Sequence, residues 1–291
     1  MAGLGFGVSI NASAAPGADP AAEARHAEEL GFDLVTLTDH LPGTRPTHET
    51  WTLLTWLAAA TERIQVGTNV LGLPYRHPAV TAKMAASLDR LSGGRLVLGL
   101  GAGGSNAEFE AFGLPVRQPG EKVDAFEEAL GIIHGLWTED DFDYRGRHYH
   151  VHDATIEPKP DREIPVWLGV YGRRALGIAG RLAQGWIPSM RFAPPERWKR
   201  LRDVVRRAAE EANRNPDDIT YAYNVAVRVD PNAQPREHVV AGPAEKVAEQ
   251  LTTLAAIGIT FLNLWPAGDP AEQRERMASE VIPAVRSTIG S

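Results

Sequence analysis

Residues 64–101 are IQVGTNVLGLPYRHPAVTAKMAASLDRLSGGRLVLGLG, and this stretch decides the fold. Its first and last runs, IQVGTNVL and RLVLGLG, are short and apolar, as is typical of buried strands. Between them, Val80, Met84, Leu88 and Leu91 recur at helical spacing. A strand, a helix and a second strand in this order predict a βαβ unit, and therefore a parallel sheet.

The same alternation extends over the whole chain. Further apolar runs predict strands at 4–10, 34–38, 165–170, 185–189, 221–229 and 259–265. Helix-like segments separate them, such as Pro20–Leu30, which Gly31 ends. Eight strands interleaved with helices suit a closed barrel better than an open sheet. We therefore expect an α/β fold, a single (β/α)8 TIM barrel forming one domain over residues 1–291.

One segment breaks this pattern. A long helix, marked by apolar residues that include Val123, Phe126 and Leu130, is followed at 141–154 by DFDYRGRHYHVHDA. This run alternates in polarity on both sides of a central Arg-Gly, which predicts a β-hairpin. We expect it to be an insertion into the barrel at about 138–160.

Composition restricts the function. The chain has 291 residues, no cysteine and a formal net charge of −7. Without thiols, redox chemistry needs a bound cofactor. The negative charge argues against binding to nucleic acid or to a membrane surface. No apolar run is long enough to span a bilayer, and MAGLGFGVSI lacks the pattern of a signal peptide, so we expect a cytoplasmic protein.

In such barrels function lies where strands end and loops begin. Asp39 and His40 end the second predicted strand. A histidine can exchange a proton near neutral pH, and an adjacent carboxylate can orient it, so we expect His40 to be catalytic and Asp39 to position it. Position near a strand end also suggests candidate substrate-pocket residues, namely Trp51, Tyr75, Trp186 and Arg191.

Two glycine-rich turns follow strands. The first, Gly99–Gly104, has the G-x-G-x-x-G spacing of a dinucleotide site. A Rossmann fold also needs a short helix and an acidic residue at the end of the next strand, whereas here a polar stretch and a long helix follow. We therefore interpret these glycines as letting a flat ring or a phosphate approach the barrel mouth.

The second turn is Leu168-Gly-Val-Tyr-Gly-Arg-Arg174, between the fifth strand and a helix. Backbone N–H groups at a helix N-terminus attract phosphate, and Arg173 or Arg174 can add positive charge. The alternative is a tight turn with solvated arginines. The coincidence of turn, helix start and cations favours phosphate binding.

The hairpin contains His148, His150 and His152 at alternate positions. This spacing can hold zinc, but it lies away from the strand ends and has no second ligand cluster. We expect a solvated hairpin face and no metal, which leaves a zinc hydrolase as a distant alternative. The mixed charges at 198–214 likewise predict the exposed side of a helix.

Several stretches resemble one known family when taken together and in order. They are GFDLVTLTDHLPG (31–43), the run at 64–104, EFEAFGLP (108–115), IPVWLGVYGRRALGIAGRLAQGWIPS (164–189) and GITFLNLWPAGD (258–269). In this combination the chain resembles the luciferase-like monooxygenase superfamily, especially its branch that uses coenzyme F420. The similarity extends from Leu4 to about Val285.

The resemblance implies a TIM-like barrel with F420, or alternatively FMN, at its mouth, and a homodimer. It implies a non-proline cis peptide between Asn69 and Val70 behind the cofactor ring, with Asp39 and His40 beside the ring. The cofactor-binding residues that it implies are Asp39, Asn69, Val70, Gly103, Gly104, Gly169, Val170, Tyr171, Gly172 and Arg173.

One position departs from the resemblance. The sugar-phosphate dehydrogenases of this branch carry a catalytic glutamate directly after the first glycine turn, where this chain has Gly104, with Glu108 and Glu110 nearby. The GVYGRR segment looks closer to methylene-tetrahydromethanopterin-reductase-like members. We therefore expect an oxidoreductase that transfers a hydride between F420 and an unidentified small organic substrate. An FMN-dependent monooxygenase and a non-catalytic flavin-binding relative are the alternatives.

Overall fold

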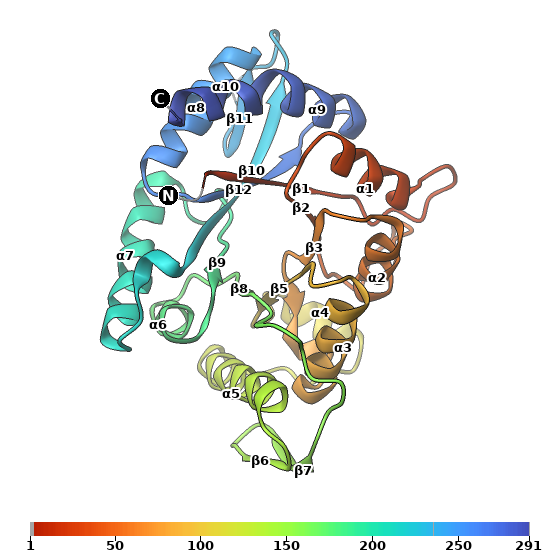
Figure 1. Ribbon diagram of the computed structural model, residues 1–291, viewed down its shortest axis with the longest axis vertical. Helices are drawn as coiled ribbons and strands as arrows, with labels where there is room; N and C mark the ends of the chain where they lie inside the picture. Colours follow the sequence, from red (N-terminus) through yellow and green to blue (C-terminus); the bar gives the residue numbers. More distant parts are fainter. Residues whose placement is uncertain (1–2, 235, 291) are drawn as a thin grey trace.

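Parallel strands form a closed ring in the order in which they occur in the chain. The computed structural model, shown in Figure 1, describes residues 3–234 and 236–290. Pairing of β9 with β10 closes the ring, which confirms the predicted α/β TIM barrel. The eight strands of the ring are β1 (Gly5–Ser9), β2 (Leu34–Leu37), β3 (Gln65–Thr68), β5 (Leu96–Gly101), β8 (Val166–Leu168), β9 (Gly185–Trp186), β10 (Thr220–Val229) and β12 (Phe261–Pro266).

Helices lie outside the ring and cover it (Figure 1). The α-helices are α1 (Pro20–Glu29), α2 (Thr50–Ala60), α3 (Pro78–Leu91), α4 (Asn106–Ala111), α5 (Pro119–Thr138), α6 (Arg173–Leu182), α7 (Pro195–Glu211), α8 (Ala244–Ala256), α9 (Pro270–Arg276) and α10 (Ile282–Ile289). Shorter or irregular turns are η1 (Leu73–Tyr75), η2 (Pro216–Asp218) and η3 (Met277–Val281).

Local sequence explains where these helices begin. Asp19 caps α1 by accepting a hydrogen bond from the N–H of Ala22, and Pro20 occupies the first helical position. Gln118 and Glu121 form a capping box at the start of α5. The strands, by contrast, are almost entirely buried, as expected for a parallel sheet covered by helices.

The third predicted strand is interrupted. It divides into β3 and β4 (Leu71–Gly72), and the bond between Asn69 and Val70 that separates them is cis, as the resemblance implies. Both halves pair with β5, so the chain bulges at these two residues and rejoins the same neighbour.

Glycines surround the side chain at the centre of this bulge. A Cβ placed on Gly99, Gly101 or Gly169 would lie 3.4, 2.7 or 3.0 Å from a methyl carbon of Val70. A Cβ at Gly99 would also lie 1.9 Å from a backbone oxygen. The two glycines in β5 therefore make room for the bulge, which gives the G-x-G spacing a physical reason unrelated to dinucleotide binding.

The insertion is the expected hairpin. Its strands, β6 (Phe142–Arg145) and β7 (His150–Ala154), pair antiparallel. The Glu128 carboxylate on α5 accepts hydrogen bonds from three consecutive backbone N–H groups in the hairpin turn. A further strand, β11 (Val239–Gly242), pairs with β10 beside the ring and was not predicted. In the part of the chain that the structure describes, no helix is long and apolar enough to cross a membrane.

Candidate functional site

A cavity of about 760 Å³ lies at the carboxyl ends of the strands. Its size suits a small organic ligand. The loops after β2, β3, β5, β8 and β9 contribute to its wall, together with Asn224 in β10 and Trp265 in β12, as expected for a barrel of this kind.

A buried ion-pair network lies on one side of this cavity. The carboxylate of Asp39, which has no exposed side-chain surface, accepts hydrogen bonds from the N–H of Gly72 (2.9 Å) and from Arg76 (2.8 Å). Arg76 also pairs with Glu49, whose carboxylate caps α2. Burial opposes the charge of Arg76, but the two carboxylates leave its pKa above the ordinary value. The network joins the ends of β2 and β4 to the start of α2.

His40 belongs to a different cluster. Its Nδ1 lies 3.1 Å from a carboxylate oxygen of Glu108, and that oxygen accepts a 2.5 Å hydrogen bond from Tyr75. Burial raises the pKa of Glu108, but the hydrogen bonds from Tyr75 and His40 outweigh it and leave this pKa below its usual range. Burial, together with the bond to Glu108, raises the pKa of Tyr75. At neutral pH, Glu108 is therefore a carboxylate that two donors hold at the cavity wall.

A row of buried amides supports the bulge. Asn69 and Asn224 exchange hydrogen bonds of 2.6 and 3.1 Å between their side chains. Asn263 donates to Asn224 (2.8 Å) and to the hydroxyl of Thr36 (3.1 Å). Since buried amides need partners, each residue of this row fixes the orientation of the next. Asn69 is thereby oriented from the opposite side of the barrel.

The glycine turn after β5 borders the cavity. Gly103 has a φ of +87°, and a Cβ there would lie 2.5 Å from Phe109, so only glycine fits. Lys122 on α5 reaches the turn and donates a 2.9 Å hydrogen bond to the Gly103 carbonyl. Burial lowers the pKa of Lys122. A Cβ at Gly104 would meet nothing within 4 Å, so the main chain faces open space there.

The glycine turn after β8 leads into α6. No side chain caps the N-terminus of this helix, which begins at Arg173, and Gly172 and Ala175 line the cavity. Its first N–H groups are therefore available to a ligand. Tyr171 lies beside the turn, where its hydroxyl accepts a 2.9 Å hydrogen bond from the N–H of Ser189.

A second cavity of about 520 Å³ adjoins the first. Thr38, His40 and Trp265 line both. The remaining wall of the second cavity carries mostly polar side chains from the loops after β1 and β2, among them Asn11, Thr44, Arg45, Thr47 and His48. His40 therefore lies between the larger cavity, whose wall is mainly apolar, and the second cavity, whose wall is mainly polar.

This geometry agrees with the comparison of the sequence with protein families. The model of the luciferase-like monooxygenases matches residues 5–240. The chain belongs to this family.

Two similar curated proteins are named for the same activity. An F420-dependent glucose-6-phosphate dehydrogenase of Microbacterium testaceum is 33% identical over 262 residues, covering 88% of this chain and 74% of the relative. A protein of the same name from Amycolatopsis mediterranei is 30% identical over 261 residues, again covering 88% and 74%.

Solved structures of two F420-dependent enzymes share the fold. An F420-dependent secondary alcohol dehydrogenase in complex with an F420-acetone adduct superimposes with a TM-score of 0.88 at 20% identity, covering 97% of this chain and 99% of the other. The F420-dependent tetrahydromethanopterin reductase of Methanopyrus kandleri gives 0.83 at 21% identity, with the same coverage.

Most residues expected at the site line the larger cavity. They are Asp39, His40, Asn69, Val70, Tyr75, Gly103, Gly104, Gly169, Val170, Tyr171 and Gly172. Four others lie elsewhere. Trp51, Trp186 and Arg191 line neither cavity, and Arg173 lies in a groove between α6 and α7.

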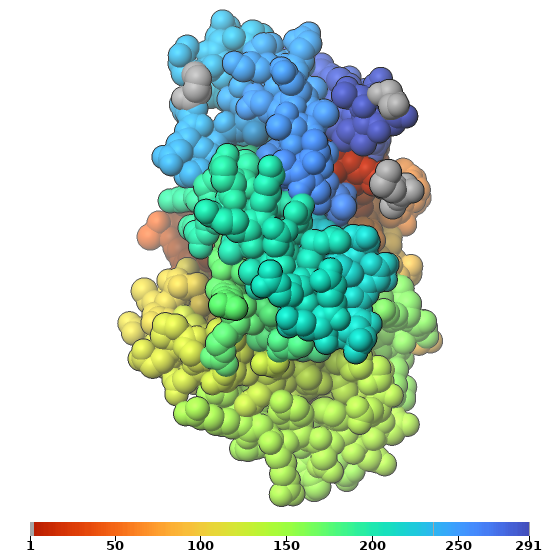
Figure 2. Space-filling view, turned by 90° about the vertical axis from the view of Figure 1, so that its left-hand side faces the viewer, coloured from red at the N-terminus to blue at the C-terminus, as the bar shows by residue number. Residues whose placement is uncertain are grey.

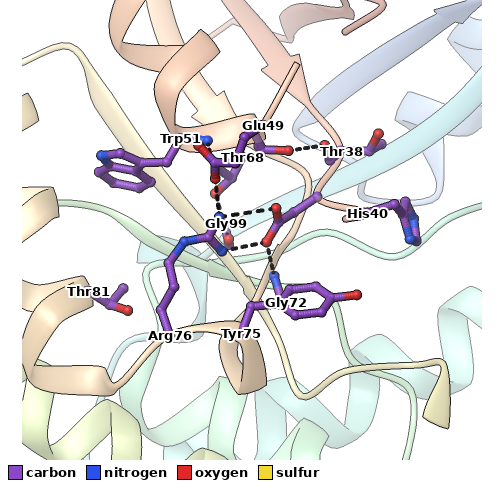
Figure 3. Close-up of polar contacts among 12 residues, drawn as sticks. Thr38, His40, Glu49, Trp51, Thr68, Gly72, Tyr75, Arg76, Thr81 and Gly99 are labelled. Atoms are coloured by element: carbon purple, nitrogen blue, oxygen red, sulfur yellow. Dashed lines mark hydrogen bonds and ion pairs between the residues drawn. The ribbon is translucent and has the colours of Figure 1, made fainter. Parts of the chain in front are cut away.

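The prediction of the two tryptophans as pocket residues was wrong, because both belong to the core. Trp51 is 8% exposed on the inner side of α2, and Figure 3 shows its ring directed away from the carboxylates. Trp186 is fully buried, stacks on Trp198, and donates to the carbonyl of Val170. Arg191 is exposed beside the cavity, with its guanidinium 5.8 Å from the ring centre of Phe192, which does line it, and its place in the substrate pocket stays a prediction.

The expected pairing of Asp39 with His40 was wrong as well. The carboxylate of Asp39 is occupied by Gly72 and Arg76, whereas Nδ1 of His40 lies against Glu108. Adjacent residues in an extended segment point to opposite sides. The partner of His40 is Glu108 instead, a residue that had been noted only for its spacing.

Sequence reasoning missed Asn224 and Lys122. Asn224 interrupts the apolar run YAYNVAVRV, and an uncharged amide inside a buried strand is a signal that a polar network needs it. Lys122 stands in the first turn of a helix with no such signal. Among the described residues, no group of three or more histidine and carboxylate side chains is placed to hold a metal ion, and His152 pairs instead with Asp143.

Proposed function

We propose that this protein is an oxidoreductase that transfers a hydride between coenzyme F420 and a small organic substrate. The observation that carries the proposal is the position of the His40–Glu108 pair at the rim of a cavity backed by Val70. A proton-exchanging pair beside an apolar wall suits a flat redox ring. The names of the similar dehydrogenases support the same cofactor.

The residues present fit such a cofactor. Val70 and Ile187 offer apolar surface to a ring, while Gly104 and Gly172 expose main chain where a side chain would stand in open space. The uncapped start of α6 offers N–H groups to a phosphate. A ring, a linker and a phosphate can therefore be accommodated in order across the cavity.

Coenzyme F420, when bound, supplies the hydride chemistry. We assign the accompanying proton to the imidazole of His40, which the Glu108 carboxylate orients. In this proposal Glu108, on α4, takes the place of the glutamate that the resemblance leads one to expect at the position of Gly104. Asp39 has a structural role in this proposal, since Arg76 and Gly72 hold it.

The smaller cavity is the proposed approach for the substrate. It shares His40 with the larger one, and its wall carries hydroxyl, amide and cationic side chains. A small polar organic molecule suits this lining.

Two alternatives remain distinct from this proposal. An FMN-dependent monooxygenase and a non-catalytic flavin-binding relative share the fold and an apolar ring site. The deciding experiment is a titration of the purified protein with F420 and with FMN, followed by tryptophan fluorescence. Micromolar or tighter binding of F420 with weaker FMN binding supports the proposal, and substrate-dependent oxidation or reduction of F420 separates an enzyme from a mere binder. Preference for FMN with oxygen uptake contradicts it.

We also propose that the chain works as one domain, as a homodimer and in the cytoplasm. Exposed apolar side chains on α2 and α3, Trp56 and Leu91, are 64% and 81% accessible and supply surface for a partner copy. Light scattering of the purified protein tests this state, and a monomer at micromolar concentration contradicts it.

A further inference from the structure

A groove of about 460 Å³ runs between α6 and α7, outside the cavity described above. The two helices lie side by side at the left of Figure 1, and Figure 2 views the molecule from that side. Its walls carry Arg173 and Arg181 from α6, and Arg207 and Glu211 from α7. Gly177 also lines the groove, and a Cβ there would lie 3.2 Å from the Arg181 guanidinium.

Two of these arginines have no polar partner in the described part of the chain. Within residues 3–234 and 236–290, Arg173 and Arg207 make no hydrogen bond or ion pair. Arg181 pairs with Glu127 on α5, and the neighbouring Arg174 pairs with Asp124. Glu211 is the one carboxylate in the described lining of the groove. In a chain of net charge −7, this groove is a local concentration of positive charge.

The groove begins at the N-terminus of α6, next to the cavity. Arg173 is the first residue of α6, where the helix dipole disfavours a cation unless an anion lies nearby. Gly172, directly before it, lines the cofactor cavity, so the groove begins where the cavity ends. Arg173, Gly177 and Arg181 follow at intervals of four along one face of the helix, so the row extends about 12 Å from the barrel mouth.

The tail of the proposed cofactor is negatively charged and therefore complements the positively charged groove. Coenzyme F420 continues beyond its phosphate as a lactyl group and a chain of γ-linked glutamates, each with a carboxylate, whereas FMN ends at its phosphate. We propose that the groove between α6 and α7 binds this oligoglutamate tail, chiefly through Arg173 and Arg207. The inference rests on the proposed function, because it takes the phosphate to lie at the start of α6.

The experiment compares two forms of the cofactor. Tryptophan-fluorescence titrations at low ionic strength measure the affinity for F420 with several glutamates and for the tail-less form that ends at the lactyl group. We expect the wild-type protein to bind the tailed form about tenfold more tightly, as two exposed ion pairs can supply, and 0.5 M salt to reduce this preference.

Variants of the groove residues test whether these residues bind the tail. The double variant Arg173→Ala/Arg207→Ala should lose about tenfold in affinity for the tailed form and nothing for the tail-less form. Glu211→Gln should tighten binding of the tailed form, because it removes a like charge. Arg25→Ala, an exposed arginine on α1, is the matched control and should change neither affinity.

The outcomes separate the two proposals. Equal affinity of the wild-type protein for both forms overturns the groove assignment and leaves F420 binding intact. A double variant that weakens both forms equally also overturns it, because the arginines would then act on the shared part of the cofactor. Failure to bind either form contradicts the proposed function together with the groove.

Discussion

Nδ1 of His40 lies 3.1 Å from Oε2 of Glu108, although 68 positions separate the two residues in the chain. His40 follows β2, and Glu108 stands on the short helix α4 beyond the glycine turn of β5. The imidazole is 67% exposed and the carboxylate 23% exposed, so the pair is open to the cavity. A carboxylate held in this way orients the imidazole and directs its other ring nitrogen outward.

Replacing His40 with alanine should slow turnover of F420 by about 10²–10⁴-fold, the usual contribution of a general acid or base. Affinity for the cofactor should stay within about twofold, because the proposed ring contacts come from other residues. Steady-state rates and fluorescence titrations measure the two effects. His152→Ala is the matched control, since His152 also pairs with a carboxylate but lies in the hairpin. Unchanged turnover in the His40 variant removes the assigned role.

Glu108→Gln should lower turnover by about tenfold or more while the protein stays folded. The amide keeps a hydrogen-bonding group of the same size, but it lacks the carboxylate charge and presents an NH₂ donor where the imidazole needs an acceptor. Glu110→Gln is the control, because Glu110 is exposed on the same helix and lines neither cavity. Equal rates in the two variants would show that Glu108 acts only as a spacer.

Tyr75→Phe should shift the acidic limb of the pH–rate profile to higher pH. The Tyr75 hydroxyl helps to lower the pKa of Glu108, so its removal lets that pKa rise towards the ordinary value. The same shift affects stability. Because the folded-state pKa of Glu108 lies below the unfolded value, its contribution is complete above the unfolded pKa and is lost as pH falls through the folded one. Urea unfolding at several acidic pH values measures this, and a limb that does not move contradicts the assignment.

Asp39→Asn should destabilise the protein by about 3 kcal/mol, since it removes one partner from a buried ion pair. Thermal or urea unfolding of the apoprotein measures the loss. Asp143→Asn breaks an exposed pair with His152 and should leave the unfolding midpoint almost unchanged. If Asp39→Asn cost no more than this control, Asp39 would not hold the barrel mouth together.

The fold could be predicted because each barrel strand is a short apolar run and each helix an amphipathic one. The site could be predicted only in part. Trp186 ends β9 and Trp51 lies in the first turn of α2, after the loop that follows β2, but position alone does not distinguish an aromatic side chain in the core from one in a pocket. The link between His40 and Glu108 depends on how two loops meet in space. The amide row was in principle detectable, because Asn224 and Asn263 each interrupt an apolar run.

Arg76 joins three segments before any ligand arrives: the end of β2 through Asp39, the start of α2 through Glu49, and the turn after β4 from which it projects. Folding therefore already fixes the side-chain conformations on this side of the cavity. An incoming molecule meets side chains whose rotamers are already fixed, so little conformational entropy is lost on association. Calorimetry should accordingly find that little binding entropy is lost to ordering of these side chains. In an Arg76→Met variant the side chains would be ordered by the ligand instead, so the binding entropy should become less favourable.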